Sequence, residues 1–304
     1  MTPGVLILTG PTASGKSALA IALAERFGAE IVGADSRQIY RGMPIGTAAP
    51  SESDRARVPH HLVGFLDPSE QYSAARFVAD ALAAIDAIHA RGRRALVAGG
   101  TGFYVRALAG DVALSQANDA SLRERLAREA HLHPPDVLAA WLAAIAPARA
   151  AAIDPRDRYR VTRALEIALA ERAAGARPPA SAPDNLRTRG IPLRKLSLEI
   201  EREELLKRIA TRVDAMLADG LCEEAERVGS GAVAADAVGY REALAFLSGW
   251  STAAELRDQL VRNTRRYAKR QATWFRAEPG LVRIGAARRL EDAAAEAGAL
   301  PGWA

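Results

Sequence analysis

The segment with the clearest chemical signature lies near the start of the chain and reads Gly10-Pro11-Thr12-Ala13-Ser14-Gly15-Lys16-Ser17. It fits the pattern G-x-x-x-x-G-K-[ST], in which backbone N–H groups of a glycine-rich loop wrap a phosphate. Lys16 supplies a positive charge, and the Ser17 hydroxyl is a candidate ligand for Mg²⁺. An apolar run at 4–9 precedes the loop and a helical pattern begins at Lys16, which is the context that this motif requires. We therefore predict a loop at 10–17 that binds a diphosphate or a nucleotide.

Nucleotide hydrolases with such a loop also place an acidic residue at the end of an apolar strand, where it helps to hold Mg²⁺. Here the candidate strand at 94–98 is followed by Gly-Gly-Thr-Gly, so it offers the hydroxyl of Thr101 but no carboxylate. The acid stands instead at Asp35, where a second apolar strand, 30–34, ends. Because carboxyl ends of parallel strands share one edge with the phosphate loop, we expect Asp35 to face the same cleft.

Positive charge is concentrated near the end of the chain. Between 262 and 276 there are six basic residues and no acidic one, in a segment with helical spacing. At ~100° per residue the six occupy about 140° of the helix surface, opposite an apolar face that includes Tyr267. Such a cationic stripe is typical of a surface that contacts a phosphate backbone. The stripe consists of Arg262, Arg265, Arg266, Lys269, Arg270 and Arg276.

The elements that position these residues follow from the hydrophobic pattern. Strands alternate with helices in the first 100 residues, which predicts an α/β fold with a parallel sheet flanked by helices, as in P-loop NTPases. From 116 to 187 the chain is rich in alanine and helical, with no strand candidate, and a strand at 195–200 then resumes the core. We expect three parts, namely 1–115 as the first part of the core, 116–187 as an all-helical insertion domain, and 188–304 as the continuation of the core.

Composition excludes several classes of protein. A single cysteine among 304 residues excludes a disulfide framework and a cysteine-based zinc site. No apolar run approaches ~18 residues, so the sequence predicts no contact with a membrane core. The net charge of +5 permits a polyanionic partner without requiring one. We expect a cytoplasmic protein that acts as a monomer.

Several stretches together resemble the bacterial tRNA dimethylallyltransferase (tRNA isopentenyltransferase, IPP transferase) family. The pairing of DSRQIYRGMPIGTA at 35–48 with AKRQATWF at 268–275 is far more specific than the phosphate loop alone. The matching stretches run in order over nearly the whole chain. They include GPTASGKSALA at 10–20, GGTGFYVRAL at 99–108, RYRVTRALE at 158–166 and VGYREAL at 238–244.

The resemblance implies Mg²⁺-dependent transfer of a dimethylallyl group from dimethylallyl diphosphate to the N6 amine of adenine 37, beside the anticodon of tRNAs that read codons beginning with U. The loop at 10–17 then holds the diphosphate leaving group, with Lys16 stabilising its negative charge, and no water-activating acid is needed. Asp35 is suited to orient the amine and take its proton, with Thr101 close to the base. The adenine must leave its stack to enter the cleft.

The same resemblance assigns contacts with the tRNA anticodon stem-loop. The implied residues are Asp35, Ser36, Arg37, Gln38, Thr101, Arg123, Tyr159, Arg160, Val161, Thr162 and Arg163. We add the stripe residues Arg265, Arg266, Lys269 and Arg270 because of their charge. Asp157 and Glu166 are close enough in sequence to pair with the insertion arginines instead.

Two departures from the family pattern affect the details of the site. Asp236 stands where the family usually has Arg, Lys or Gln, which leaves Arg241 to serve in a contact with the diphosphate or the tRNA. The stretch 113–119 also differs from the family's proline-rich version.

Other activities remain open at this point. A small-molecule kinase would share the phosphate loop, and an adenylate isopentenyltransferase of the cytokinin type would use a free nucleotide as acceptor. A non-catalytic RNA-binding module would explain the basic stripe but not Lys16 or Asp35. Turnover of ATP and a comparison of AMP with tRNA as acceptors separate these alternatives.

Overall fold

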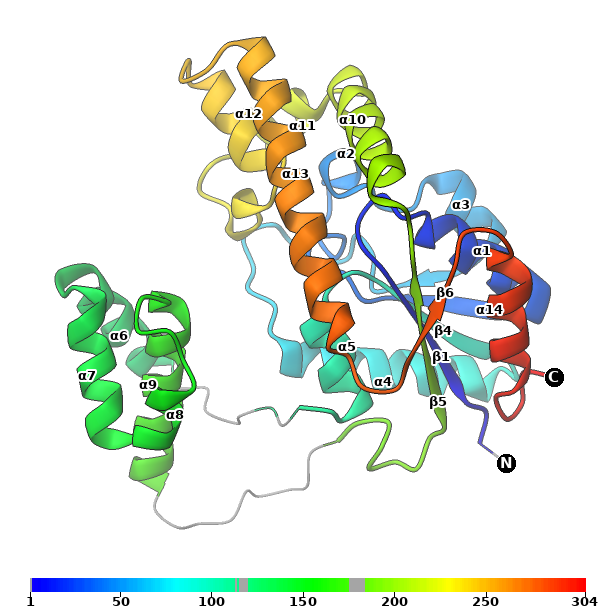
Figure 1. Ribbon diagram of the computed structural model, residues 1–304, viewed down its shortest axis with the longest axis horizontal. Coiled ribbons are helices and arrows are strands. Elements are labelled where there is room, and N and C mark those ends of the chain that lie inside the picture. The colour runs from blue at the N-terminus through cyan, green and yellow to red at the C-terminus, as the bar shows by residue number, and fades with distance from the viewer. Residues whose placement is uncertain (1, 113, 115–119, 175–183) are drawn as a thin grey trace. The chain divides into compact units, whose positions relative to one another are not determined.

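The computed structural model describes residues 2–112, 114, 120–174 and 184–304 (Figure 1). It forms two compact units, one made of Met1–Val112 with Asp184–Ala304 and the other of Ala113–Pro183. The second unit thus begins three residues before the predicted insertion and ends four residues before its predicted end. Most of the departing stretch at 113–119 lies outside the described residues.

A six-stranded parallel sheet forms the centre of the first unit, in the order β3-β2-β4-β1-β5-β6. The predicted fold class, a parallel sheet with flanking helices, is therefore confirmed. Two short strands at the edges, β3 and β6, were not expected from the sequence. The strands are β1 (Val5–Thr9), β2 (Ala29–Gly33), β3 (His60–His61), β4 (Arg94–Ala98), β5 (Leu193–Leu198) and β6 (Leu281–Ile284).

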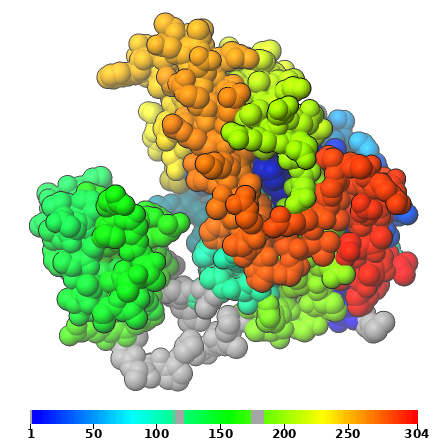
Figure 2. Space-filling view, in the orientation of Figure 1, coloured from blue at the N-terminus to red at the C-terminus, as the bar shows by residue number. Residues whose placement is uncertain are grey.

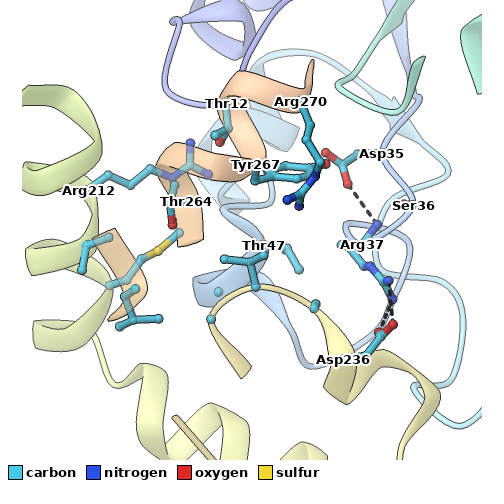
Figure 3. A pocket seen from close by; sticks show the side chains of 17 residues that line it. Thr12, Asp35, Ser36, Arg37, Thr47, Arg212, Asp236, Thr264, Tyr267 and Arg270 are labelled. Atoms are coloured by element: carbon cyan, nitrogen blue, oxygen red, sulfur yellow. Dashed lines mark hydrogen bonds and ion pairs between the residues drawn. The ribbon is translucent and has the colours of Figure 1, made fainter. Parts of the chain in front are cut away.

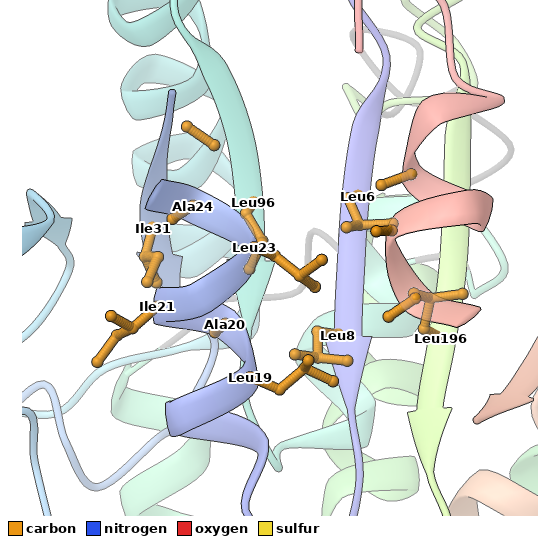
Figure 4. Packing of buried hydrophobic residues seen from close by; sticks show 14 of the residues in the cluster. Leu6, Leu8, Leu19, Ala20, Ile21, Leu23, Ala24, Ile31, Leu96 and Leu196 are labelled. Atoms are coloured by element: carbon orange, nitrogen blue, oxygen red, sulfur yellow. The ribbon is translucent and has the colours of Figure 1, made fainter. Parts of the chain in front are cut away.

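Helices cover both faces of this sheet (Figure 1). Helices α1 and α14 pack on one face, where Leu19 and Leu23 meet Leu6, Leu8 and Leu196 of the strands (Figure 4). Helix α4 contacts β2 and β4 and packs beside α5. The four helices are α1 (Lys16–Phe27), α4 (Ala74–Ala90), α5 (Gly102–Ala109) and α14 (Arg289–Gly298).

A second group of helices lies beyond the carboxyl ends of the strands (Figure 1). Helix α10 packs against α13, and α12 packs against both α11 and α13. Their shared core includes Val213, Leu221, Tyr240 and Leu260, all buried. The group consists of α2 (Pro44–Thr47), α10 (Arg202–Ala218), α11 (Leu221–Val228), the 3₁₀ helix η1 (Val233–Asp236), α12 (Tyr240–Leu247) and α13 (Ala253–Arg276). The short helix α3 (Glu52–Arg57) packs instead against α1.

A buried ion cluster joins three parts of the first unit. Lys195 of β5 donates to Asp111 and, at 2.5 Å, to Glu278 just after α13. Arg106 of α5 pairs with the same Glu278 at 2.7 Å, and Arg187 pairs with Asp111. Because charges this deeply buried are stable only when paired, the cluster fixes the end of α13 against the sheet.

The second unit is entirely helical in its described residues. Its core contains Leu126, Leu138, Leu142, Val161 and Leu165. The helices are α6 (Ala120–Leu132), α7 (Pro135–Ile145), α8 (Pro147–Ala151) and α9 (Arg158–Ala174). In neither unit does a described helix combine the length and the apolar character that a membrane crossing needs.

Candidate active site at the carboxyl edge of the sheet

The phosphate loop connects β1 to α1 and is held by a residue from the far end of the chain. Gln271 of α13 is buried and accepts a hydrogen bond from the Thr12 N–H at 2.8 Å. Its amide nitrogen donates to the carbonyl of Gly100 at 3.0 Å. Gln271 therefore ties the loop to the segment after β4. Sequence reasoning missed this residue, although it lies inside the AKRQATWF stretch.

The loop has the backbone and the unpaired groups expected of a ligand site. Gly15 adopts a φ of 91°, and Ala13 also has a positive φ, 64°, which is uncommon for a residue with a side chain. The hydroxyl of Ser14 is buried and has no hydrogen-bond partner among the described residues. Since an unpaired buried hydroxyl is costly, its presence fits a loop that is completed by a ligand.

Lys16 begins α1, as predicted, and its charge is strongly perturbed. Although the residue as a whole is half-buried, removal of its ammonium group from water lowers its pKa to about 8. The nearby Asp35 carboxylate opposes this shift, and the Arg212 guanidinium adds to it. A lysine in this state gains from a bound anion, which would restore its charge.

Asp35 follows β2 and faces a pocket of about 260 Å³ beside the loop, as the sequence predicted (Figure 3). Thr12 contributes to the same wall, so the carboxylate and the phosphate loop meet in one cavity. Figure 3 shows Tyr267 and Arg270 beside Asp35, with Arg37 and Asp236 further along the wall. The remaining lining residues are Ser36, Gly46, Thr47, Arg212, Val213, Met216, Ala237, Val238, Gly239, Leu260 and Thr264.

Thr101 and Gln38 act on the backbone near Asp35 and do not line this pocket. The Thr101 hydroxyl accepts the Ser36 N–H at 2.9 Å and donates to the Ser36 hydroxyl at 3.3 Å. The Gln38 amide donates to the carbonyls of Thr47 and Ala48. Both side chains thus hold backbone that lines the pocket, and the catalytic role of Thr101 stays a prediction.

Arg212 lies in the pocket wall, and no sequence motif singles it out. It belongs to α10, and its charge acts on both Lys16 and Asp35. Burial lowers the pKa of Arg212, and the Asp35 carboxylate counteracts that effect. With Lys16 it places two cations next to the loop, where a diphosphate would accumulate negative charge.

Tyr267 is the clearest correction to the predicted basic helix. Sequence spacing placed it on the apolar core face, but it lines the pocket and carries the Arg270 guanidinium 5.6 Å from its ring centre. Burial and the nearby Asp35 raise the pKa of Tyr267, so its hydroxyl stays protonated at neutral pH. Helix α13 has 24 residues and runs from the core to the pocket, so the same face is buried in the core at one position and lines the pocket at another. The spacing of apolar residues around the helix does not distinguish these positions.

A buried carboxylate holds the α2 segment of the pocket wall. Glu224 of α11 accepts the N–H groups of Ile45 and Gly46 at 3.0 and 2.8 Å and the Tyr240 hydroxyl at 2.5 Å. A Cβ on Gly46 would lie only 2.5 Å from the Tyr240 ring. The close approach explains why glycine is needed there and why the adjoining Thr47 is fixed at the pocket.

Comparison with known proteins decides the family. An IPP transferase family model matches residues 38–278, and an isopentenyl transferase model matches residues 3–58. The chain belongs to the IPP transferase family. The resemblance inferred from the motifs is therefore confirmed, and the match runs through both units of the structure.

Relatives of this IPP transferase chain are similar over nearly their full length. A tRNA dimethylallyltransferase of Anaeromyxobacter dehalogenans is 47% identical, covering 92% of this chain and 94% of the relative. One from Geobacter metallireducens is 44% identical, covering 91% of each chain. Among solved structures, the tRNA isopentenylpyrophosphate transferase of Bacillus halodurans is 37% identical with a TM-score of 0.66, covering 93% of this chain and 90% of that one. A eukaryotic dimethylallyltransferase acting on tRNA has a TM-score of 0.75 at 27% identity, covering 92% and 73%.

The cationic stripe on α13 is exposed and available. Arg265, Arg266, Lys269 and Arg270 are all exposed, and none of the six stripe residues forms an ion pair with another described residue. Arg241, the second residue of α12, is instead paired with Glu242 at 2.9 Å.

The insertion residues behave differently from the stripe. Arg123 and Arg163 both pair with the buried Glu166, at 3.0 and 2.5 Å, and Arg160 pairs with Asp157. Tyr159 is 80% exposed, and Thr162 donates to the Arg158 carbonyl. Val161 is 1% exposed within the core of the unit, so the predicted contact of its side chain with tRNA is wrong. A family motif marks the helix, but only its helical phase separates core positions from surface positions.

The phosphate loop fits a Mg²⁺ ion that takes most of its ligands from water and from the phosphates of the substrate. Ser17 is exposed near the start of α1 and offers one hydroxyl. Among the described residues no three acidic, histidine or cysteine side chains gather as a metal cage. Mg²⁺ commonly keeps several waters and binds substrate phosphates, so one protein hydroxyl is sufficient for this mode.

A second pocket, of about 360 Å³, lies on the other side of the loop at Pro11. Its walls come from the end of β5, from α10 and from the end of α13, including Leu198, Leu205 and Phe275. Figure 2 shows dark blue atoms of the N-terminal segment at the floor of a hollow between α10 and the C-terminal part of the chain. The phosphate loop therefore borders both pockets, with Thr12 in the wall of the first and Pro11 in the wall of the second.

Proposed function

We propose that this protein transfers the dimethylallyl group of dimethylallyl diphosphate to the N6 amine of adenine 37 in tRNAs that read codons beginning with U. The products are N6-(dimethylallyl)adenosine and diphosphate. The proposal rests on one pocket, which brings the phosphate loop and Asp35 together. Part of its wall comes from α13, the helix that also bears the cationic stripe. Membership of the IPP transferase family supports the same chemistry.

The donor's diphosphate is the leaving group, and the loop is built to stabilise it. As the bond between C1 and the diphosphate oxygen breaks, its electron pair stays on that oxygen. Lys16, Arg212 and the backbone N–H groups of the loop place positive charge where this negative charge grows. Since α1 begins at Lys16, its N-terminal dipole acts in the same direction. A bound Mg²⁺, held at Ser17, would add charge neutralisation there.

The acceptor amine forms the new bond to C1 and loses one proton. We assign this proton to the Asp35 carboxylate, which faces the pocket while one of its oxygens accepts the Arg37 N–H at 2.9 Å. That hydrogen bond fixes the direction of the carboxylate, as a general base requires. Tyr267, which stays protonated, can donate a hydrogen bond to the adenine or to the leaving group.

The tRNA is held through its backbone by the stripe on α13. Four exposed cations that form no ion pair with a described residue contact phosphates at little cost, because no ion pair must first be broken. Arg123, Tyr159, Arg160, Thr162 and Arg163 of the insertion are proposed as further tRNA contacts, and Arg241 as another. We also propose that the protein acts in the cytoplasm as a monomer.

Three parallel reactions test the proposal. Dimethylallyl diphosphate and Mg²⁺ are incubated with the protein and either unmodified tRNA or AMP, and a third mixture contains ATP alone. We expect prenyl transfer to tRNA, none to AMP and no ATP hydrolysis above that of a Lys16→Met control. Transfer to AMP would indicate the adenylate-type alternative, and ATP turnover lost in the control would indicate a kinase or hydrolase.

A further inference from the structure

One cation of the pocket wall differs from the others because it already has a bound carboxylate. Arg37 follows Asp35 after β2, and Asp236 ends η1, 199 positions later in the chain. The two side chains meet through Nη1 and Oδ1 at 2.8 Å and through Nη2 and Oδ2 at 3.2 Å (Figure 3). Both residues line the pocket that contains Asp35.

The geometry of this pair is the one that arginine uses for a phosphate. A guanidinium offers two parallel N–H donors, and a carboxylate or a phosphate accepts both with two oxygens. Asp236 therefore satisfies the same donors of Arg37 that an RNA phosphate would take. Arg270 lines the same pocket without any ion pair to a described residue, so the occupied state is particular to Arg37.

The pair is exposed enough to exchange partners. The side chain of Arg37 is 35% exposed and that of Asp236 is 67% exposed. Ion pairs between such groups are weak in water, because solvent screens them and separated side chains recover their freedom. A phosphate group of a tightly held RNA can therefore displace the Asp236 carboxylate from Arg37.

We propose that Asp236 is a resident competitor for the RNA backbone, which occupies the phosphate-binding donors of Arg37 until the acceptor tRNA displaces it. This inference rests on the proposed function, since it concerns the same tRNA. By this competition Asp236 weakens tRNA binding and so favours release of the product. Arg, Lys or Gln at this position could not fill that role, because none of them carries a negative charge.

A purely structural role for the pair predicts the opposite result. If Asp236 served only to fix Arg37 and η1 in place, its replacement would loosen the pocket wall and weaken tRNA binding. If Asp236 competes with phosphate, Asp236→Asn frees the guanidinium and removes a negative charge from the tRNA path. The amide keeps the size of the side chain, so packing changes little.

The experiment measures tRNA binding by filter retention for the wild type, Asp236→Asn, Arg37→Gln and the double variant, between 50 and 200 mM salt. We expect Asp236→Asn to tighten tRNA binding about three- to tenfold. The gain has two parts of similar size, because no exposed ion pair has to be broken and the RNA is no longer repelled by the carboxylate. The plot of log affinity against log salt should become steeper by about 0.7 to 0.9, the value for one additional phosphate contact. In the Arg37→Gln background the steeper slope should disappear, and Asp236→Asn should give only the smaller gain that comes from the lost repulsion.

A matched control separates a local effect from a change in net charge. Asp214 on α10 forms a similar exposed pair with Arg257, at 2.6 Å, and neither residue lines the pocket. Asp214→Asn changes the net charge by the same amount, and we expect it to leave the salt dependence within error of the wild type.

Two results would overturn the inference. Unchanged or weaker binding by Asp236→Asn would show that the carboxylate does not compete with the RNA, and so would an equal gain in the Arg37→Gln background. A wild-type protein that binds tRNA no better than it binds a duplex DNA of equal charge would instead contradict the proposed function itself.

Discussion

The charge of Lys16 should control binding of the prenyl donor over an accessible range of pH. Its pKa is lowered to about 8, mainly because the ammonium group is removed from water. With that pKa, about nine in ten lysines are charged at pH 7 and about one in ten at pH 9. Because the diphosphate binds the charged form, we expect its Kd to be constant below pH 8 and to rise about tenfold per pH unit above it.

The pH at which the Kd begins to rise, here called the break, follows the pKa of Lys16. Two charged neighbours of Lys16 shift this pKa and so move the break. The Arg212 cation lowers the pKa of Lys16, so Arg212→Gln should raise that pKa and shift the break to higher pH. The Asp35 carboxylate raises the pKa of Lys16, so Asp35→Asn should shift the break to lower pH. Both variants also change the Kd itself, and the pH of the break is the quantity to compare.

Isothermal titration calorimetry with dimethylallyl diphosphate, from pH 6.5 to 9.5, gives the Kd without any need for turnover. Arg257→Gln is a suitable control, because it removes a cation of the same kind from a surface pair on α13. A Kd that stays constant up to pH 9, or a break at the same pH in all four proteins, would refute the reasoning.

The stability of the protein without its ligand offers a second check. Its unfolded chain holds this proton more tightly, so the contribution of Lys16 to stability should rise with pH from about 8 toward the unfolded value.

Three further predictions concern the base, the stripe and the buried ion cluster. Asp35→Asn should lower kcat by about 10²-fold or more while the Kd for tRNA changes little, as single-turnover assays and filter binding would show. A near-normal rate would remove it from the role of base. Arg265→Glu with Lys269→Glu should weaken tRNA binding and flatten its salt dependence, and an unchanged slope would exclude the stripe. Lys195→Met should reduce the free energy of unfolding, measured in urea, by about 3–5 kcal/mol, because it leaves two buried carboxylates without their shared cation. A loss below ~1 kcal/mol would show that Arg106 and Arg187 alone stabilise these carboxylates.

The parts of the fold that could be predicted are those set by short-range patterns. The strand, loop and helix around Lys16 are specified by an apolar run, glycines and helical spacing within 24 residues, and they occur where expected. The edge strands β3 and β6 have only two and four residues, and β3 consists of two histidines, so their existence depends on a neighbouring strand that the local sequence does not reveal.

The candidate site was predictable only where a strand end fixes a residue. Asp35 is placed by the end of β2, whereas Arg212 and Gln271 reach the site from helices far along the chain. Their roles depend on how α10 and α13 pack over the loop, which no spacing within either helix encodes. Thr101 shows a further contact that no motif encodes, because its hydroxyl also holds the backbone of Ser36.

The most direct test of the account is nucleoside mass analysis of unmodified tRNA after incubation with the protein, Mg²⁺ and dimethylallyl diphosphate. A parallel reaction uses the same tRNA with guanine in place of adenine 37. We expect one added C5H8 group on the adenosine at position 37 and no product in the substituted tRNA. An unmodified adenosine 37, or equal prenylation of both tRNAs, would contradict it.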